Sequence, residues 1–349
     1  MNNFKNRKFV KYQKDFTPYR VEEDMKLLIT GGLGFIGSNF ILDLLSKNEE
    51  ISIINLDDEL LGSNPLSLKK IENSKNYEYV KGNITNEQLI SKLIKKCDII
   101  VNFAAESHVD RSISNAKPFI NSNINGTFTI LEAIRKYEKK LVHISTDEVF
   151  GSLKSESADE NFKFNPSSPY SASKASAELL INSFFVTYGC DCMITRCTNN
   201  YGPRQFPEKL IPKIILYAKN NKKIPIYGTG KNIRDWIHVS DHCNAIFQVL
   251  KKGKKGSSYN ISSDNEVDNE TIIKKILILM KKPIDFVEYV KDRPGHDFRY
   301  SMDSSKIRKE LGWSPKINFD VGLEKTINWY LKNEVWWKNI SNDMLVPNW

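Results

Sequence analysis

The residue types best suited to acid–base chemistry lie in the middle of the chain. Tyr170 and Lys174 are four residues apart, so on a helix both side chains lie on one face, one turn apart. A lysine held beside a phenol lowers the phenol's pKa from its free value near ~10, and the tyrosine can then act as a general base. Upstream, Thr146, Asp147 and Glu148 place a hydroxyl beside two adjacent carboxylates. This spacing predicts a site that exchanges protons with a substrate.

The acidic pair also has a structural interpretation. Ser145 followed by Glu148 matches a capping box, which is the pattern of a helix start. The Tyr170–Lys174 pair and a glycine-rich loop upstream favour the catalytic interpretation.

Residues 25–37 have the pattern of a loop that binds a dinucleotide. A short apolar run is followed by Gly31, Gly34 and Gly37, and then by the apolar spacing of a helix. Glycines let the backbone approach a pyrophosphate at the N-terminus of that helix. The next apolar run ends at Asp57, whose carboxylate accepts from a ribose 2′-hydroxyl and repels a 2′-phosphate. The chain is therefore predicted to bind NAD rather than NADP.

Apolar runs alternate with helical patterns through the first half of the chain. Strands are expected near residues 77–80, 98–103 and 141–145. A helix is expected over residues 119–134, with an apolar stripe of Ile120, Ile124, Thr127, Leu131 and Ile134. This alternation predicts an α/β fold with a Rossmann-type, doubly wound parallel sheet. Such a sheet binds ligands at the carboxyl ends of its strands, where we expect Gly31, Asp57, Ala104, Ala105 and Thr146.

Changes in composition divide the chain into three parts. Residues 1–24 form a polar, basic extension, and residues 25–197 are predicted to form the NAD-binding domain, to which segments near 236–262 return. Residues 198–349 begin with stretches rich in Pro, Asn and aromatic residues, as expected of loops that face a ligand. They are predicted mainly to form a smaller C-terminal domain that binds the substrate.

The overall composition is that of a soluble globular protein, with 40% hydrophobic and 27% charged residues. We expect a cytoplasmic protein with reduced thiols, because no apolar run approaches the ~20 residues of a membrane span, no targeting segment is recognisable and the 5 cysteines are unevenly spread. Cys190 and Cys192, like His238 and His242, lack the further ligands of a zinc site, so no metal is predicted. The net charge of +9 comes from scattered lysines, so nucleic acid is not an expected partner.

The chain resembles the nucleotide-sugar 4,6-dehydratases of the extended short-chain dehydrogenase/reductase superfamily, most of all those that act on dTDP-glucose. The resemblance runs from about residue 26 to residue 330. It depends on several motifs in order: T-G-G-L-G-F-I-G, N-F-A-A-E-S-H-V-D-R-S-I, S-T-D-E-V, Y-S-A-S-K, N-N-Y-G-P, N-I-R-D-W and D-R-P-G-H-D. Thr-Asp-Glu is the specific part, because related 4-epimerases lack the acidic pair and nucleotide-sugar decarboxylases lack the Asp.

The resemblance implies a role for each catalytic residue. Tyr170, assisted by Lys174 and Thr146, takes the proton of the sugar 4-hydroxyl while C4 passes a hydride to NAD. Glu148 then removes the C5 proton, and Asp147 protonates the departing C6 hydroxyl. Return of the hydride to C6 gives a 4-keto-6-deoxy sugar and regenerates NAD. Elimination needs Asp147 protonated near pH 7, which requires a rise of roughly three units from ~3.9.

The resemblance also implies two sets of ligand-binding residues and a homodimer. The cofactor-binding set is Gly31, Gly34, Phe35, Ile36, Gly37, Asp57, Asn83, Ile84, Ala104, Ala105, Tyr170 and Lys174. The set for the nucleoside-diphosphate-glucose is Ser107, His108, Asn199, Lys209, Leu210, Arg234, Asn269 and His296. The family dimer packs helices at 118–136 and 172–188, and the apolar stripe on the first is compatible with that.

The chain departs from the family pattern at the adenosine end of the cofactor. The segment 58–63 differs from the usual K-L-T-Y-A-G, and Asn83 stands where an Asp contacts the adenine. The Asn83 carbonyl is expected to accept the adenine amino group instead. A third departure, not assigned to the adenosine end, is Phe150 in place of a common Tyr.

Three alternatives stay open at the level of sequence. A nucleotide-sugar 4-epimerase needs Tyr170 and Lys174 but not Asp147, and its product lacks the 4-keto-6-deoxy group. A UDP-glucose 4,6-dehydratase shares nearly all of the motifs, because no residue distinguishes thymine from uracil. A non-catalytic dinucleotide-binding protein is disfavoured by the intact set of catalytic residues.

Overall fold

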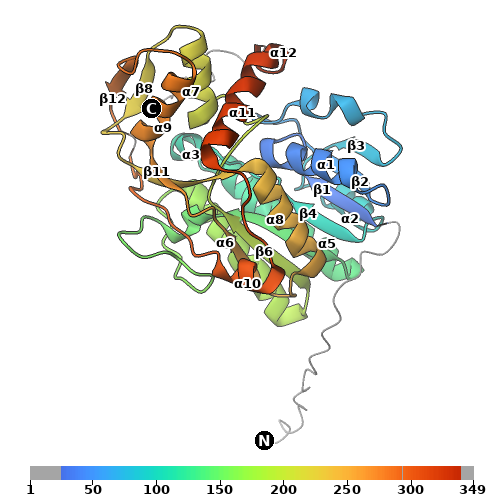
Figure 1. Ribbon diagram of the computed structural model, residues 1–349. Coiled ribbons are helices and arrows are strands. Elements are labelled where there is room, and N and C mark those ends of the chain that lie inside the picture. Colours follow the sequence, from blue (N-terminus) through green and yellow to red (C-terminus); the bar gives the residue numbers. More distant parts are fainter. Residues whose placement is uncertain (1–24, 293, 339–349) are drawn as a thin grey trace, which may run out of the picture.

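A seven-stranded sheet forms the centre of the computed structural model, which describes residues 25–292 and 294–338. Its strand order is β10-β6-β5-β4-β1-β2-β3, and each pair of neighbours is parallel (Figure 1). The strands are β1 (Lys26–Thr30), β2 (Ser52–Asp57), β3 (Tyr77–Lys81), β4 (Ile99–Asn102), β5 (Lys140–Thr146), β6 (Asp191–Cys197) and β10 (Ser258–Ile261). The predicted α/β fold with a doubly wound parallel sheet is confirmed.

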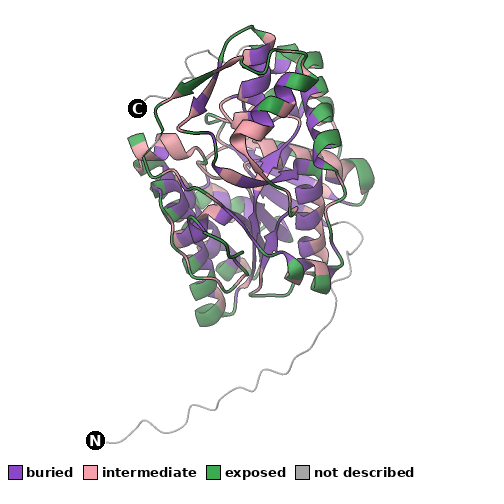
Figure 2. Cartoon of the chain, turned by 60° about the vertical axis from the view of Figure 1, so that its left-hand side comes forward, coloured by how far each residue is buried: buried purple, intermediate pink, exposed green. Residues whose placement is uncertain are grey.

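Helices cover both faces of this sheet because successive strand residues point to opposite sides. Leu27 and Ile29 enter the core beneath α1 (Phe35–Lys47), α8 (Val239–Lys252) and α10 (Ser305–Leu311). Leu28 enters the opposite core, beneath α2 (Glu87–Ile94), α5 (Thr127–Tyr137) and α6 (Pro169–Tyr188). Figure 2 shows the result, with buried strands in the middle and exposed outer faces on the helices.

The helix predicted over residues 119–134 is present but changes its geometry along its length. It consists of α4 (Lys117–Phe119), η3 (Ile120–Gly126) and α5, and η3 is a π-helix. A π-helical turn contains more residues than an α-helical turn, so the side chains after it point in a different direction from those before it. As a result Leu131 and Ile134 are buried, whereas Ile120 is 49% exposed. The predicted apolar stripe therefore faces the core only in its second half.

A second layer lies at the carboxyl end of the large sheet (Figure 1, top). One of its two small sheets has three strands, β7 (Asn199–Tyr201), β9 (Ile233–His238) and β11 (Glu266–Asp268). The other has two strands, β8 (Ile224–Tyr227) and β12 (Val287–Val290). They share a core with α7 (Leu210–Lys219), α9 (Asn269–Leu279), α11 (Phe319–Lys332) and α12 (Glu334–Lys338). Short helices complete the chain: η1 (Pro65–Ser67), η2 (Lys69–Ile71), α3 (Val109–Ser114) and η4 (Asp147–Phe150).

The chain passes between the layers more than once, because α8, β10 and α10 follow the second-layer strand β7 in sequence and pack in or on the large sheet. The predicted extension, residues 1–24, lies outside the described residues. Within the described part of the chain, no helix has the length and apolar character needed to cross a membrane. The five cysteines are free and buried, and the described residues contain no cluster that could hold a metal ion.

Candidate active site

A cleft at the carboxyl ends of the central strands brings together most of the predicted site residues. Those that line it are Gly31, Gly34, Phe35, Ile36, Gly37, Asp57, Asn83, Ile84, Ala104, Ala105, Ser107, His108, Thr146, Asp147, Glu148, Tyr170, Lys174, Asn199 and Lys209. Four predicted substrate residues, Leu210, Arg234, Asn269 and His296, are not among the described residues that line this cleft.

The glycine loop connects β1 to α1 at one end of the cleft. Gly31 has a φ of 71°, and a Cβ on it would lie 2.6 Å from the backbone nitrogen of Ala104. A Cβ on Gly37 would lie 2.5 Å from the carbonyl oxygen of Gly31. Gly34 begins α1 without a side-chain cap, so the N-terminal amides of the helix face the cleft without a competing side chain. The loop thus has the close packing and the helix N-terminus that a pyrophosphate requires.

Asp57 organises the loop that follows β2. Its Oδ2 accepts from the backbone N–H of Leu33 at 2.9 Å, and its Oδ1 accepts from the backbone N–H of Glu59 at 2.9 Å and from Ser63 Oγ at 2.8 Å. Burial raises the pKa of Asp57, and the Ser63 hydrogen bond opposes that rise. A carboxylate oxygen can accept two bonds, so Oδ2 retains capacity for a ribose hydroxyl.

Asn83 is engaged differently from the expectation. Its carbonyl oxygen already accepts from Thr85, from the backbone N–H at 2.9 Å and from Oγ1 at 2.7 Å, while its amide donates to Asp58 Oδ2 at 2.8 Å. Both lone pairs of the carbonyl are therefore used. A role of Asn83 toward adenine stays a prediction, and Asp58 provides another acceptor at this end of the cleft.

Tyr170 and Lys174 lie one turn apart on α6, as their spacing predicted. Ser168 begins this helix with a capping box that includes Ser171. Both functional side chains are buried, and burial lowers the pKa of Lys174 to about 8. Lys174 Nζ donates to the carbonyl oxygen of Ile144 at 2.6 Å.

The expected lowering of the Tyr170 pKa is wrong for the protein by itself. Burial raises the pKa of the phenol well above its ordinary value, and the Glu148 carboxylate adds to this rise. A hydrogen bond with the Thr146 side chain acts in the opposite direction but is the smaller effect. The desolvation of the phenolate in the closed site therefore outweighs the groups that favour it.

The acidic pair follows directly on β5. Thr146 is the N-cap of η4, since its hydroxyl accepts from the backbone N–H of Glu148 at 3.3 Å. A helix start, the structural alternative suggested by the spacing of Ser145 and Glu148, is thus present as well, but its N-cap is Thr146 rather than Ser145. The same hydroxyl donates to Asp147 Oδ1 at 3.0 Å. Helix capping and the arrangement of the acidic pair thus depend on one side chain.

Asp147 is in the environment that a general acid needs. It is 3% exposed, and its Oδ2 has no hydrogen-bond partner among the described residues. Burial, followed by the charge of Glu148, raises its pKa to about 8. Asp147 is therefore the carboxyl group that stays protonated near pH 7, which is the state that the predicted acid requires.

Two of the predicted substrate residues outside the cleft, Arg234 and His296, have other partners. Arg234 is buried over the ring of Tyr300 and donates to the carbonyl oxygens of Ile233 at 2.7 Å and Asp297 at 2.8 Å. His296 Nδ1 lies 2.7 Å from Asp292 Oδ1. Asn269 and Leu210 are the first residues of α9 and α7.

Glu106, Arg111 and Glu208 also line the cleft, although they were not predicted. Arg111 pairs with Glu208, and His108 Nε2 lies 3.7 Å from the same carboxylate. Burial raises the pKa of Glu106. Glu106 and Arg111 lie in the run A-E-S-H-V-D-R, which the sequence analysis had already used for Ser107 and His108. Proximity in sequence, however, did not indicate which charged residues of this run face the cleft.

A doubly wound parallel sheet with a glycine loop and a buried tyrosine–lysine pair defines the extended short-chain dehydrogenase/reductase class. Comparison with known proteins identifies the family within this class. Residues 28–326 match the family described as GDP-mannose 4,6 dehydratase. The dTDP-glucose 4,6-dehydratase of Mycobacterium tuberculosis H37Rv is 43% identical, over 91% of this chain and 97% of that protein.

Two solved structures extend the comparison. The dTDP-glucose 4,6-dehydratase of Streptomyces venezuelae, solved with NAD and TYD bound, superposes with a TM-score of 0.89 at 41% identity, over 91% of this chain and 100% of that one. The Bacillus anthracis enzyme, solved in complex with NAD, gives a TM-score of 0.86 at 45% identity over the same shares. The chain belongs to the GDP-mannose 4,6 dehydratase family and, within it, to the dTDP-glucose 4,6-dehydratases.

Proposed function

We propose that this protein is a hydro-lyase that converts dTDP-glucose to its 4-keto-6-deoxy product with NAD as a resident cofactor. The observation that carries the proposal is the buried Asp147 beside Glu148, in the same cleft as Tyr170. Elimination of water needs a proton donor beside a second carboxyl group, and Asp147, whose pKa is about 8, is such a donor. A 4-epimerase does not need this acidic pair. The names of two similar proteins, those of Mycobacterium tuberculosis and Streptomyces venezuelae, agree with this assignment.

The residues of the cleft suit NAD at the glycine loop. Gly31, Gly34 and Gly37 would hold the pyrophosphate at the start of α1, and Asp57 would hold the adenosine ribose. When bound, NAD supplies a hydride acceptor for C4 and, once reduced, a hydride donor for C6. Ala104 and Ala105, which follow β4, leave room beside the loop because their side chains are small.

The side chains of the protein then divide the proton transfers. Tyr170 takes the proton of the 4-hydroxyl as a phenolate, so the phenol, which burial keeps neutral in the protein by itself, first has to release its own proton. Thr146 is bonded to the phenol, and Lys174, one turn further along α6, favours the phenolate as an ammonium group. Once C4 is a ketone, the C5 proton is acidic and Glu148 removes it. The C6–oxygen bond breaks, and Asp147 gives its proton to the departing hydroxyl, which leaves as water.

The substrate is proposed to lie between the two layers. Ser107, His108, Asn199 and Lys209 line the cleft, and Lys209 Nζ donates to the Ser107 carbonyl at 2.9 Å. We also propose contacts from Leu210, Arg234, Asn269 and His296, which would have to gain access as the substrate binds. The division of the chain at residues 197–198 into a cofactor and a substrate domain is part of this proposal.

We propose a homodimer formed by the helical segments 118–136 and 172–188. The apolar stripe predicted over residues 119–134 cannot provide the whole contact, because Leu131 and Ile134 are buried in the core of this protein. Other apolar side chains of these segments are exposed: Ile120 at 49%, Phe128 at 45%, Leu179 at 60% and Val186 at 72%. We also propose a cytoplasmic location, which agrees with five free thiols.

A substrate panel tests the function. Purified protein is offered dTDP-, UDP- and CDP-glucose, and kcat/KM is measured for the 4-keto-6-deoxy product. We expect dTDP-glucose to be preferred by at least tenfold, which corresponds to about 1.4 kcal/mol of transition-state binding. A preference for UDP-glucose would reassign the nucleobase, and formation of a 4-epimer without the deoxy product would refute the dehydratase assignment.

A further inference from the structure

A buried ion pair lies one helical turn beyond Lys174 on α6. Its members, Glu178 and Arg196, are 2% and 4% exposed. Arg196 Nε donates to the two carboxylate oxygens of Glu178 at 3.1 Å and 2.9 Å, and Arg196 Nη2 donates to Oε2 at 2.7 Å. Hydrogen bonds from a guanidinium group favour the carboxylate over the carboxylic acid. Arg196 therefore holds a negative charge at a fixed place inside the protein.

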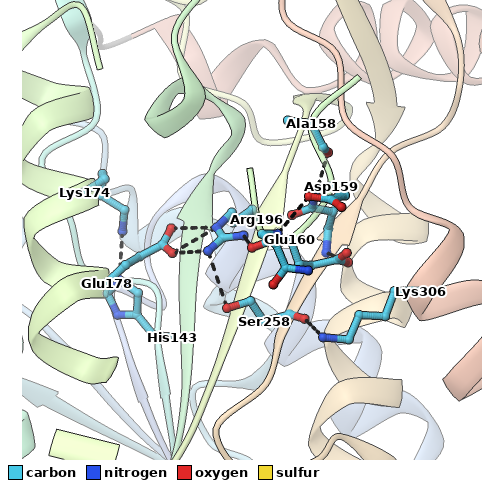
Figure 3. A network of polar contacts seen from close by, with 11 residues as sticks. His143, Ala158, Asp159, Glu160, Lys174, Glu178, Arg196, Ser258 and Lys306 are labelled. Carbon is cyan, nitrogen blue, oxygen red and sulfur yellow. Dashed lines mark hydrogen bonds and ion pairs between the residues drawn. The ribbon is translucent and has the colours of Figure 1, made fainter. Parts of the chain in front are cut away.

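This negative charge acts on Lys174. Residues four apart on a helix lie on one face, so Glu178 and Lys174 are neighbours along α6. Figure 3 shows the Glu178 carboxylate between Lys174 and Arg196. The guanidinium group is thus on the far side of the carboxylate, and its repulsion of an ammonium group at Lys174 is weaker than the attraction by the carboxylate.

Three neighbours of Lys174 on β5 and β6 carry no net charge. The carbonyl oxygen of Ile144 accepts from Lys174 Nζ at 2.6 Å, which fixes the position of the nitrogen, but a carbonyl dipole attracts an ammonium group less than a full charge does. His143 Nε2 lies 3.3 Å from Nζ, and burial lowers the pKa of His143, so the ring is neutral. Cys197 is a neutral thiol because burial raises its pKa.

Burial also keeps two acidic groups on α6 and η4 uncharged. It raises the pKa of Tyr170 well above its ordinary value and that of Asp147 to about 8, so both keep their protons near pH 7. Glu148 on η4 acts on the phenol, because its charge contributes to the rise in the pKa of Tyr170. Burial lowers the pKa of Lys174 to about 8, and the charge of Glu178 opposes this fall.

We propose that Glu178, held by Arg196, is a positioning residue that keeps Lys174 an ammonium group inside the closed site. Without such a charge, desolvation of a lysine that is 3% exposed would favour the neutral amine. The value of the pair for the reaction rests on the proposed function, in which the ammonium group of Lys174 favours the phenolate of Tyr170. The charge state of Lys174 can be measured without the reaction.

Two variants remove the carboxylate in different ways. Glu178→Gln keeps the shape of the side chain but leaves the charge of Arg196 unpaired. Glu178→Leu/Arg196→Met replaces both charges by apolar groups of similar size, so it is expected to fold even if the single variant does not. Both should lower the pKa of Lys174. The single variant should lower it more, because its remaining guanidinium group also repels the ammonium group.

The matched control is Glu160→Gln, which removes a negative charge on the other side of Arg196 (Figure 3). The backbone carbonyl of Glu160 accepts from Arg196 Nη1 at 3.2 Å, and its Oε1 accepts from the backbone N–H of Asn260 at 2.9 Å. A glutamine can make both bonds. The control therefore has the same change of charge near the same arginine, but not beside Lys174.

The measurement is an NMR titration of full-length protein labelled with [ε-¹³C]lysine, in which comparison with Lys174→Met identifies the signal. We expect Glu178→Gln to lower the pKa of Lys174 by about one unit or more, a tenfold change in proton affinity. The double variant should lower it by less, and Glu160→Gln should leave it unchanged. Thermal melting of each variant reports whether it is folded.

Single-turnover formation of NADH is the second readout. A fall of one unit from a pKa of about 8 reduces the ammonium fraction at pH 8 roughly fivefold, so the first hydride transfer should slow by a similar factor. A purely structural ion pair would change the melting temperature without moving the titration of Lys174.

The outcomes separate the inference from the function on which it rests. An unchanged or raised pKa of Lys174 in the folded double variant overturns the proposal, and so does a fall in Glu160→Gln as large as that in Glu178→Gln. If the pKa falls and NADH formation slows with it, both the ion pair and the role of Lys174 are supported. If the pKa falls but NADH formation does not slow, the effect of the ion pair stands and the proposed role of Lys174 in the reaction fails.

Discussion

The hydroxyl of Thr146 donates to Oδ1 of Asp147 across 3.0 Å, while Oδ2 of the same carboxyl group is buried without a partner among the described residues. Oδ1 of Asp147 thus accepts from a neutral donor. Oδ2 is buried away from hydrogen-bond donors, and this favours the protonated carboxylic acid. A buried carboxylate would need several donors to stay ionised, and a single hydroxyl does not offset the burial. This relationship makes Asp147 the acid in the predictions that follow.

Asp147→Asn should separate the two stages of the reaction. Oxidation at C4 uses Tyr170 and NAD, so the variant should reduce its cofactor when substrate is added. The amide cannot give a proton to the C6 hydroxyl as a carboxylic acid does, so the reaction should stall at that stage. A single-turnover absorbance trace in the NADH band, with product analysis, measures this. Product at the wild-type rate would make Asp147 structural, and absence of NADH would assign it to oxidation or folding.

The elimination step should depend on pH through Asp147. Its pKa is raised to about 8, so the acid form is present below that value and is lost as the pH rises through it. The rate of elimination in single turnovers should therefore be level near pH 7 and fall about tenfold per unit well above pH 8. Asp147→Asn should lack this limb in its residual activity.

The same shift makes a prediction about stability. Native Asp147 keeps a proton that the unfolded chain, with a pKa near ~3.9, has already released. The native state therefore binds more protons, and this carboxyl group makes the protein less stable as the pH rises from about 4 to about 8. Thermal unfolding should show a smaller loss of stability over that range in Asp147→Asn than in the wild type.

Tyr170→Phe should reduce the first hydride transfer by roughly 10²–10⁴-fold, because the phenyl ring keeps the packing but removes the base. Binding of the nucleotide sugar should change little, since the hydroxyl acts on one proton. Single-turnover formation of NADH measures the chemistry, and calorimetric titration with the substrate measures binding. Substantial NADH formation in this variant would mean that another group is the base.

Asp57→Asn should weaken the preference for NAD over NADP. The amide keeps the shape that the loop after β2 needs but loses the negative charge that repels a 2′-phosphate. We expect binding assays to show a NAD-to-NADP affinity ratio that falls by tenfold or more. Asp58→Asn is the matched control, because its carboxylate already accepts from Asn83. Wild-type protein that binds NADP as well as NAD would refute the cofactor assignment.

The ion pair between Glu178 and Arg196 should matter for stability because both side chains are buried, at 2% and 4% exposure (Figure 3). Glu178→Leu leaves the Arg196 charge unpaired and should cost roughly 3–5 kcal/mol in urea unfolding. The double variant Glu178→Leu/Arg196→Met should recover most of that loss. Removing the exposed partner Glu132 of Arg135 should cost at most about 1 kcal/mol. Equal losses at the two pairs would contradict this account.

Local pattern was sufficient for the sheet and for the residues that the backbone alone brings together. The alternation of apolar runs with helical spacing predicted the parallel sheet, because that pattern depends only on the period of each element. Asp57 and Thr146 end strands that run in one direction, and the glycines at 31, 34 and 37 follow another such strand, so they meet at the same edge of the sheet. The four-residue spacing placed Tyr170 and Lys174 on one face of α6.

What sequence did not determine are the effects that depend on burial and on contacts between distant segments. The pKa of Tyr170 is raised rather than lowered because desolvation depends on everything that encloses the phenol. The π-helical turn at η3 moved Ile120 to the surface, since it changes the helical period on which the predicted stripe was based. The ion pair of Glu178 with Arg196, one turn beyond Lys174, joins a helix to a strand, and only the folded structure makes these residues neighbours.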